Sequence, residues 1–114
     1  MDTFEILSQL CSAAGVSGAE GSAAETAAKL FGKYGEVTLD NALGSVICKV
    51  GSWEDGKPVM LLDAHIDEIG MIVTYITEDG FLKISGCGGL DTRLLLAQQV
   101  TVYGKEKLTG IVTS

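Results

Sequence analysis

The sequence predicts an α/β fold that opens with two helices and continues as strands. Three observations support this. Apolar residues recur every three or four positions up to Phe31, short β-branched runs replace that spacing after Gly35, and an apolar segment from Pro58 runs into a cluster of carboxylates and a histidine. A hydrophobic strand that ends in polar functional groups is typical of the active-site strands of α/β proteins.

Two amphipathic helices are expected near the start of the chain. The first spans residues 3–14, and its apolar stripe consists of Phe4, Leu7, Leu10, Cys11 and Ala14. The second follows Ser17 and Glu20, which have the S-x-x-E spacing of a reciprocal helix cap. We expect this second helix to end at Gly32 or Gly35, because glycine commonly terminates helices.

Strands should form the rest of the chain. The pattern predicts a hairpin from residues 37–39 and 46–50, then a buried strand at 59–62. Further strands are expected at 71–77, 81–84, 99–103 and 108–113, divided by turns that contain glycine. Beyond Gly70 the helical spacing disappears. We therefore place a domain boundary between residues 1–67 and residues 68–114. The last strand candidate has no turn or polar tail after it, so we expect either a truncated fold or burial against another chain.

Charge and composition exclude several classes of partner. The chain carries 15 acidic and 8 basic residues, a net charge of -7, with no basic patch for nucleic acid or an anionic membrane. No segment approaches the roughly 20 apolar residues of a membrane helix, and the acidic start does not resemble a secretory signal. The three cysteines are odd in number and far apart, so we expect small buried hydrophobes in a cytoplasmic protein.

The chemistry-bearing residues cluster directly after the predicted buried strand. Strand alternation would place Asp63, His65 and Asp67 on one face, and residues 58–82 contain no Lys or Arg. Such an acidic field suits a divalent cation, with His65 as ligand and Asp67 orienting its other ring nitrogen. A partly buried histidine paired with an aspartate for structural reasons is the alternative, and the short H-x-D pattern by itself favours it.

A longer string changes that balance. Residues 65–73, HIDEIGMIV, resemble the H-x-D-E-I-G-x-x-V segment of the glutamyl and deblocking aminopeptidase family, the di-metal peptidases that include tetrahedral aminopeptidases. Upstream, residues 15–20 resemble the family's G-x-S-G-x-E turn. Downstream, similar motifs are present at residues 80–82, 88–93 and 98–100. In order and spacing these motifs span nearly the whole chain, so it is identified as the amino-terminal portion of a family member.

The resemblance implies a site and an architecture. His65 matches a ligand of a pair of divalent metals, usually zinc or cobalt, and Asp67 matches the catalytic residue that orients it. Glu68 matches the motif without an assigned role, substrate-binding residues stay unknown, and the other ligands and the general base have no counterpart here. Residues 1–67 would begin a zinc-peptidase-type α/β catalytic domain. Residues 68–114 would begin an inserted β-barrel-like dimerisation domain, which makes a homo-oligomer the expected assembly.

The function implied is hydrolysis of the amino-terminal peptide bond of short peptides, with the 114 residues inactive by themselves because one metal ligand cannot hold a catalytic zinc. A non-catalytic assembly module derived from the family is the alternative. The family commonly has Pro before Arg93 and Gly before Gln98, where this chain has Thr92 and Ala97. These two departures concern loop shape. The glycine-rich segment 86–89 lacks the helix and lysine of a phosphate loop, so we expect an inter-strand turn there.

Overall fold

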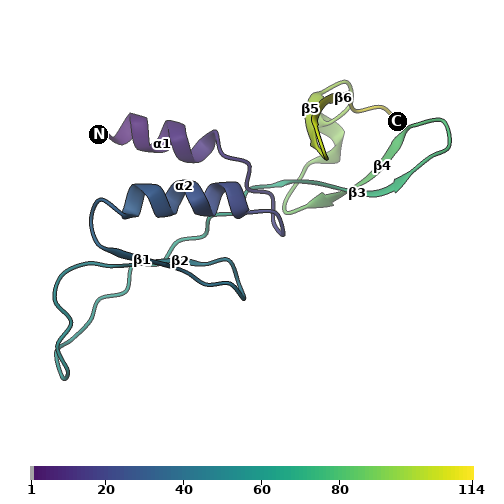
Figure 1. Cartoon of the computed structure of the whole chain (residues 1–114). Coiled ribbons are helices and arrows are strands. Elements are labelled where there is room, and N and C mark those ends of the chain that lie inside the picture. Colours follow the sequence, from purple (N-terminus) through teal and green to yellow (C-terminus); the bar gives the residue numbers. More distant parts are fainter. Residues whose placement is uncertain (1) are drawn as a thin grey trace.

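The computed structural model describes residues 2–114, which extend over 61 × 31 × 27 Å. Two helices and one hairpin lie at one end of the molecule, and two further hairpins lie at the other (Figure 1). The element order predicted from the sequence, two helices and then strands, is therefore confirmed.

The first helix, α1 (Thr3–Cys11), begins with a capping box that the sequence analysis missed. The Glu5 N–H donates to Asp2 Oδ1 at 2.8 Å, and the Asp2 N–H donates to Glu5 Oε2 at 3.1 Å. These bonds satisfy backbone donors that a helix start leaves free. The helix ends at Cys11, three residues before the expected end at residue 14.

The reciprocal cap predicted for the second helix is wrong. Helix α2 (Gly21–Phe31) has Glu20 at its N-cap without a side-chain capping bond. The Glu20 carboxylate instead accepts a hydrogen bond from the Gly18 N–H at 2.6 Å. The backbone turns at Gly18, whose φ of +87° is left-handed, so Ser17 belongs to a turn before the helix and does not cap it.

The small core belongs to α2. Its buried apolar side chains are Ala23, Ala24, Ala27 and Leu30, and no other apolar side chain of residues 2–114 is buried to that degree. Alanines let neighbouring backbones approach closely, and α1 and the first hairpin both pack against this helix. The expectation that the cysteines are buried is wrong for Cys11, which is exposed, while Cys48 and Cys87 are half-buried.

The strands pair as three separate antiparallel hairpins, each a two-stranded sheet. Their bounds are β1 (Glu36–Leu39) with β2 (Val46–Lys49), β3 (Gly70–Ile76) with β4 (Leu82–Cys87), and β5 (Gln99–Tyr103) with β6 (Lys107–Ile111). All six correspond to predicted strands, within a few residues. Gly88, with φ of +80°, turns the chain after β4, as expected for a glycine-rich turn.

Strand β3 contains an irregularity in its pairing with β4. Val73 lies opposite Ile84, whereas Tyr75 lies opposite Lys83, so Thr74 is an extra residue in the ladder. The Thr74 hydroxyl donates to the Lys83 carbonyl at 3.2 Å. The Lys83 amine lies 5.5 Å from the centre of the Tyr75 ring, on the face to which the bulge directs that ring.

The connection between β4 and β5 carries both departures from the family pattern. A short 3-10 helix, η1 (Thr92–Leu94), is capped by Asp91, which accepts from the Arg93 N–H at 3.1 Å. Ala97 has φ of 63°, and among residues 2–114 it is the one non-glycine residue in the left-handed region. In the left-handed region alanine is more strained than glycine, the residue that the family pattern has at this position.

The buried strand predicted at 59–62 does not form. Residues 50–69 contain no strand, and Leu62 is 88% exposed. A strand exists only when a neighbouring backbone supplies its hydrogen bonds, and no other part of residues 2–114 runs beside this segment as a ladder partner. Residues 59–62 are apolar as expected, but no strand within residues 2–114 pairs with them.

Candidate functional site

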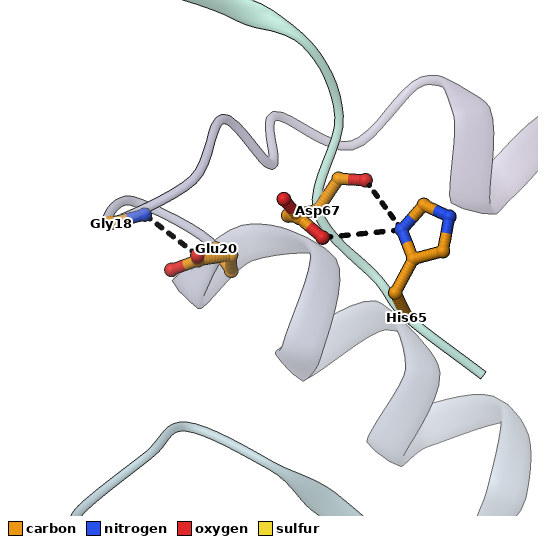
Figure 2. Close-up of polar contacts among 4 residues, drawn as sticks. All are labelled: Gly18, Glu20, His65 and Asp67. Carbon is orange, nitrogen blue, oxygen red and sulfur yellow. Dashed lines mark hydrogen bonds and ion pairs between the residues drawn. The ribbon is translucent and has the colours of Figure 1, made fainter. Parts of the chain in front are cut away.

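His65 and Asp67 form a local pair on the extended segment that leads into β3. The His65 Nδ1 lies 3.1 Å from Asp67 Oδ1 and 3.0 Å from the Asp67 main-chain oxygen. Figure 2 shows the imidazole ring with both of these contacts converging on the same nitrogen. This pairing was expected from the two-residue spacing of His65 and Asp67.

These contacts determine which ring nitrogen carries the proton. A carbonyl oxygen can only accept, so Nδ1 must donate to it, and Nδ1 then carries hydrogen. In the neutral imidazole the other nitrogen, Nε2, keeps its lone pair. The His65 side chain is 86% exposed and the Asp67 side chain 43% exposed, so the pair is open to a ligand. This is the tautomer that metal binding through Nε2 requires.

Asp63, placed on the same face by strand alternation, does not join the pair. It is exposed and makes no hydrogen bond or ion pair within residues 2–114. Alternation fails here because the segment is not a strand.

Glu68 makes a connection that the sequence analysis did not assign. Its Oε1 accepts from the Gly15 N–H at 3.1 Å, and its own N–H donates to the Gly15 carbonyl at 2.8 Å. The two residues are 53 positions apart, and Val16 and Glu68 form an isolated parallel bridge. No pattern of neighbouring residues predicts the contact between Gly15 and Glu68. The one available signal is that both segments match motifs of the same family.

A pocket of about 260 Å³ lies at this junction. Its lining includes Cys11, Gly15, His65 and Glu68, so it joins the end of α1 to the metal-ligand candidate.

A two-pronged ion pair lies in the β-rich half, away from this pocket. The Arg93 guanidinium donates to the Asp91 carboxylate at 2.9 and 2.7 Å. Those bonds lower the pKa of Asp91 and raise the pKa of Arg93.

The described residues fit a metal ion only as one ligand. Nε2 of His65 is oriented and accessible, but residues 2–114 contain no group of three His, Cys, Asp or Glu side chains that could enclose an ion. Catalytic zinc sites use about three protein ligands. The other ligands would have to come from outside this part of the chain.

The fold is shared with two solved TET structures. The TET aminopeptidase from the marine sediment archaeon Thaumarchaeota archaeon SCGC AB-539-E09 is 33% identical and superimposes with a TM-score of 0.84, covering 97% of this chain and 31% of that one. The PhTET1-12s structure, described as a dodecamer, gives 32% identity and a TM-score of 0.84 over 100% of this chain and 34% of that one. The fold therefore matches about a third of a TET aminopeptidase.

The family follows from the sequence. The model of the M42 glutamyl aminopeptidase family matches residues 44–114, and the chain belongs to that family. The FrvX protein of Escherichia coli (strain K12) is 33% identical over 97% of this chain and 31% of its own length. The chain thus spans about a third of the length of these relatives. The resemblance inferred from HIDEIGMIV is confirmed.

Proposed function

We propose that this chain is the amino-terminal third of a metal-dependent aminopeptidase that removes the first residue of short peptides. The observation that carries the proposal is the His65 tautomer: Nδ1 donates to Asp67, and Nε2 is exposed with a free lone pair. The chain's membership of the M42 family supports the proposed reaction class.

The residues present would hold and tune one of two divalent ions, zinc or cobalt. Metal ions in such sites polarise the scissile carbonyl and lower the pKa of bound water. Asp67 keeps the proton on Nδ1 and fixes the ring orientation. The 114 residues by themselves supply a single ligand and no general base, so we expect them to be inactive without the remaining two thirds of such an enzyme.

Assembly and location complete the proposal. A relative of known structure is a dodecamer, which supports a homo-oligomer here, with residues 68–114 as the start of an inserted β-barrel-like dimerisation domain and residues 1–67 as the start of the catalytic domain. The separate hairpins leave large apolar side chains exposed, as an interface would require. Three unpaired cysteines favour a cytoplasmic location. No helix within residues 2–114 is long and apolar enough to cross a membrane.

The test uses the full-length gene product that carries this chain. Zinc content and hydrolysis of dipeptides should both fall sharply in His65→Ala, and Asp67→Asn should weaken metal affinity or rate about 10- to 100-fold. Asp63→Asn is the matched control and should behave as wild type. A wild-type protein that binds no zinc or cobalt and cleaves no peptide would favour the non-catalytic assembly module instead.

A further inference from the structure

We infer that Glu68 is a positioning residue that fastens the His65–Asp67 pair to the loop at Gly15, an inference that rests on the proposed function. Glu68 occupies both backbone groups of Gly15, one through its carboxylate and one through its own N–H. Two bonds between the same two residues fix distance and orientation together. Within residues 2–114 neither residue bonds to the imidazole, so Glu68 acts through the backbone of the motif.

The packing around Gly15 shows how tightly the junction is built. Gly15 is buried, and a methyl group added to it would lie 3.0 Å from Ala23 Cβ and 3.5 Å from the Ile66 carbonyl. Gly15 is therefore confined between helix α2 and the backbone of the motif. Gly70 completes the arrangement, since a methyl group there would collide with the Val16 side chain. The core helix and the histidine motif meet through one glycine.

The histidine pair depends on this junction because little else holds it. Within residues 2–114 the only bonds of His65 go to Asp67, two positions away. The preceding segment belongs to no strand, whereas β3 begins only at Gly70. Glu68 is thus the residue closest to the pair that bonds to a distant part of the fold. Without its bonds the ring would keep its tautomer but lose a fixed place relative to α2.

Substitution of Glu68 separates positioning from ligation. A glutamine at 68 has the same length and an Oε1 that still accepts from Gly15, whereas alanine removes the acceptor and aspartate is one methylene too short to reach it. If Glu68 positions the pair, the length of its side chain determines zinc affinity and its negative charge does not. If Glu68 binds the metal or moves a proton, charge matters and glutamine fails.

The experiment measures zinc affinity of the metal-free full-length protein by competition with a chelator, and the visible spectrum of the cobalt-loaded protein. Glu68→Ala and Glu68→Asp should each weaken zinc binding about 10- to 100-fold, as loss of a supporting contact does. Glu68→Gln should stay within about fivefold of wild type, with an unchanged cobalt spectrum. Glu20→Ala is the matched control, because it removes another carboxylate bond to a loop amide, 2.6 Å long, without touching the motif.

Three results would overturn the inference: wild-type zinc affinity in Glu68→Ala, wild-type affinity in Glu68→Asp, or equal loss in Glu68→Gln and Glu68→Ala. If alanine prevents folding, the aspartate and glutamine variants decide. Failure of the proposed function has a different signature, since wild type would then bind no zinc. In that case hydrogen exchange at the Gly15 amide of the metal-free protein still tests the junction, and unchanged protection in Glu68→Gln with fast exchange in Glu68→Asp supports it.

Discussion

Replacing Gly70 with alanine should loosen the junction between the histidine motif and helix α2. The added Cβ would lie 2.8 Å from Val16 Cγ1 and 3.2 Å from Val16 Cβ, and closer still to Val16 Cγ2. Favourable contacts between carbon atoms need about 3.5 to 4.0 Å. Either β3 or the loop at Val16 must therefore move, and that loop is joined to Glu68.

The size of the effect follows from the cost of overpacking. Inserting a methyl group into a well-packed contact typically costs about 1 to 3 kcal/mol. Since about 1.4 kcal/mol changes an equilibrium constant tenfold, the junction should open about 5- to 150-fold more often. Val16→Ala removes both Cγ atoms and leaves only the contact with Cβ. Gly70→Ala should consequently cost much less in that background.

Hydrogen exchange followed by mass spectrometry measures this opening in the full-length protein. The amides of Gly15 and Glu68 are both hydrogen-bonded at the junction, so peptides that contain them should lose protection in Gly70→Ala and regain most of it in the double mutant. Gly89→Ala is the control, because a methyl group there meets no atom within 4 Å. Equal protection in Gly70→Ala and Gly89→Ala would refute the reasoning.

Three further predictions concern caps, strain and charge. Asp2→Ala should destabilise helix α1 by about 0.5 to 2 kcal/mol in denaturant unfolding, whereas Ser17→Ala, which removes no capping bond, should change little. Ala97→Gly should raise the unfolding midpoint, because relief of a left-handed alanine, about 1 to 2 kcal/mol, exceeds the extra entropy of glycine, about 0.5 to 1 kcal/mol; a lower midpoint would contradict this. The side-chain and backbone bonds from Arg93 lower the pKa of Asp91, so their support for the η1 turn is present above the usual aspartate range and is lost as pH falls through the lowered value. Carboxyl titration by NMR should show a smaller lowering in Arg93→Ala than in wild type, because alanine keeps the backbone N–H and loses the guanidinium.

Local signals predicted most of the elements. Hairpins were found because β-branched runs flank turns rich in glycine and asparagine or aspartate, and helix α2 was found because its alanines keep helical spacing. The cap of α1 was missed although Asp2 and Glu5 have the right spacing, since Ser17 and Glu20 matched the same pattern. Spacing alone does not show whether such a pair caps its helix, because that depends on where the backbone turns.

Long-range features could not be predicted from spacing. The segment 59–62 has the composition of a buried strand, but composition does not supply a partner backbone. The pairing of His65 with Asp67 was predictable because the two residues are neighbours in the chain. The bonds between Glu68 and Gly15 join residues 53 positions apart, and only the folded chain reveals them.

The bulge at Thr74 has a consequence for how relatives of this chain should differ in length. Side chains alternate along a strand, so loss of one residue normally exchanges its two faces for every residue beyond. At Thr74 the exchange has already happened: Val73 and Tyr75 face successive partners, Ile84 and Lys83. Deleting Thr74 would restore a regular ladder and leave both faces as they are. A one-residue deletion should therefore be tolerated better at Thr74 than at the regularly paired positions of β3.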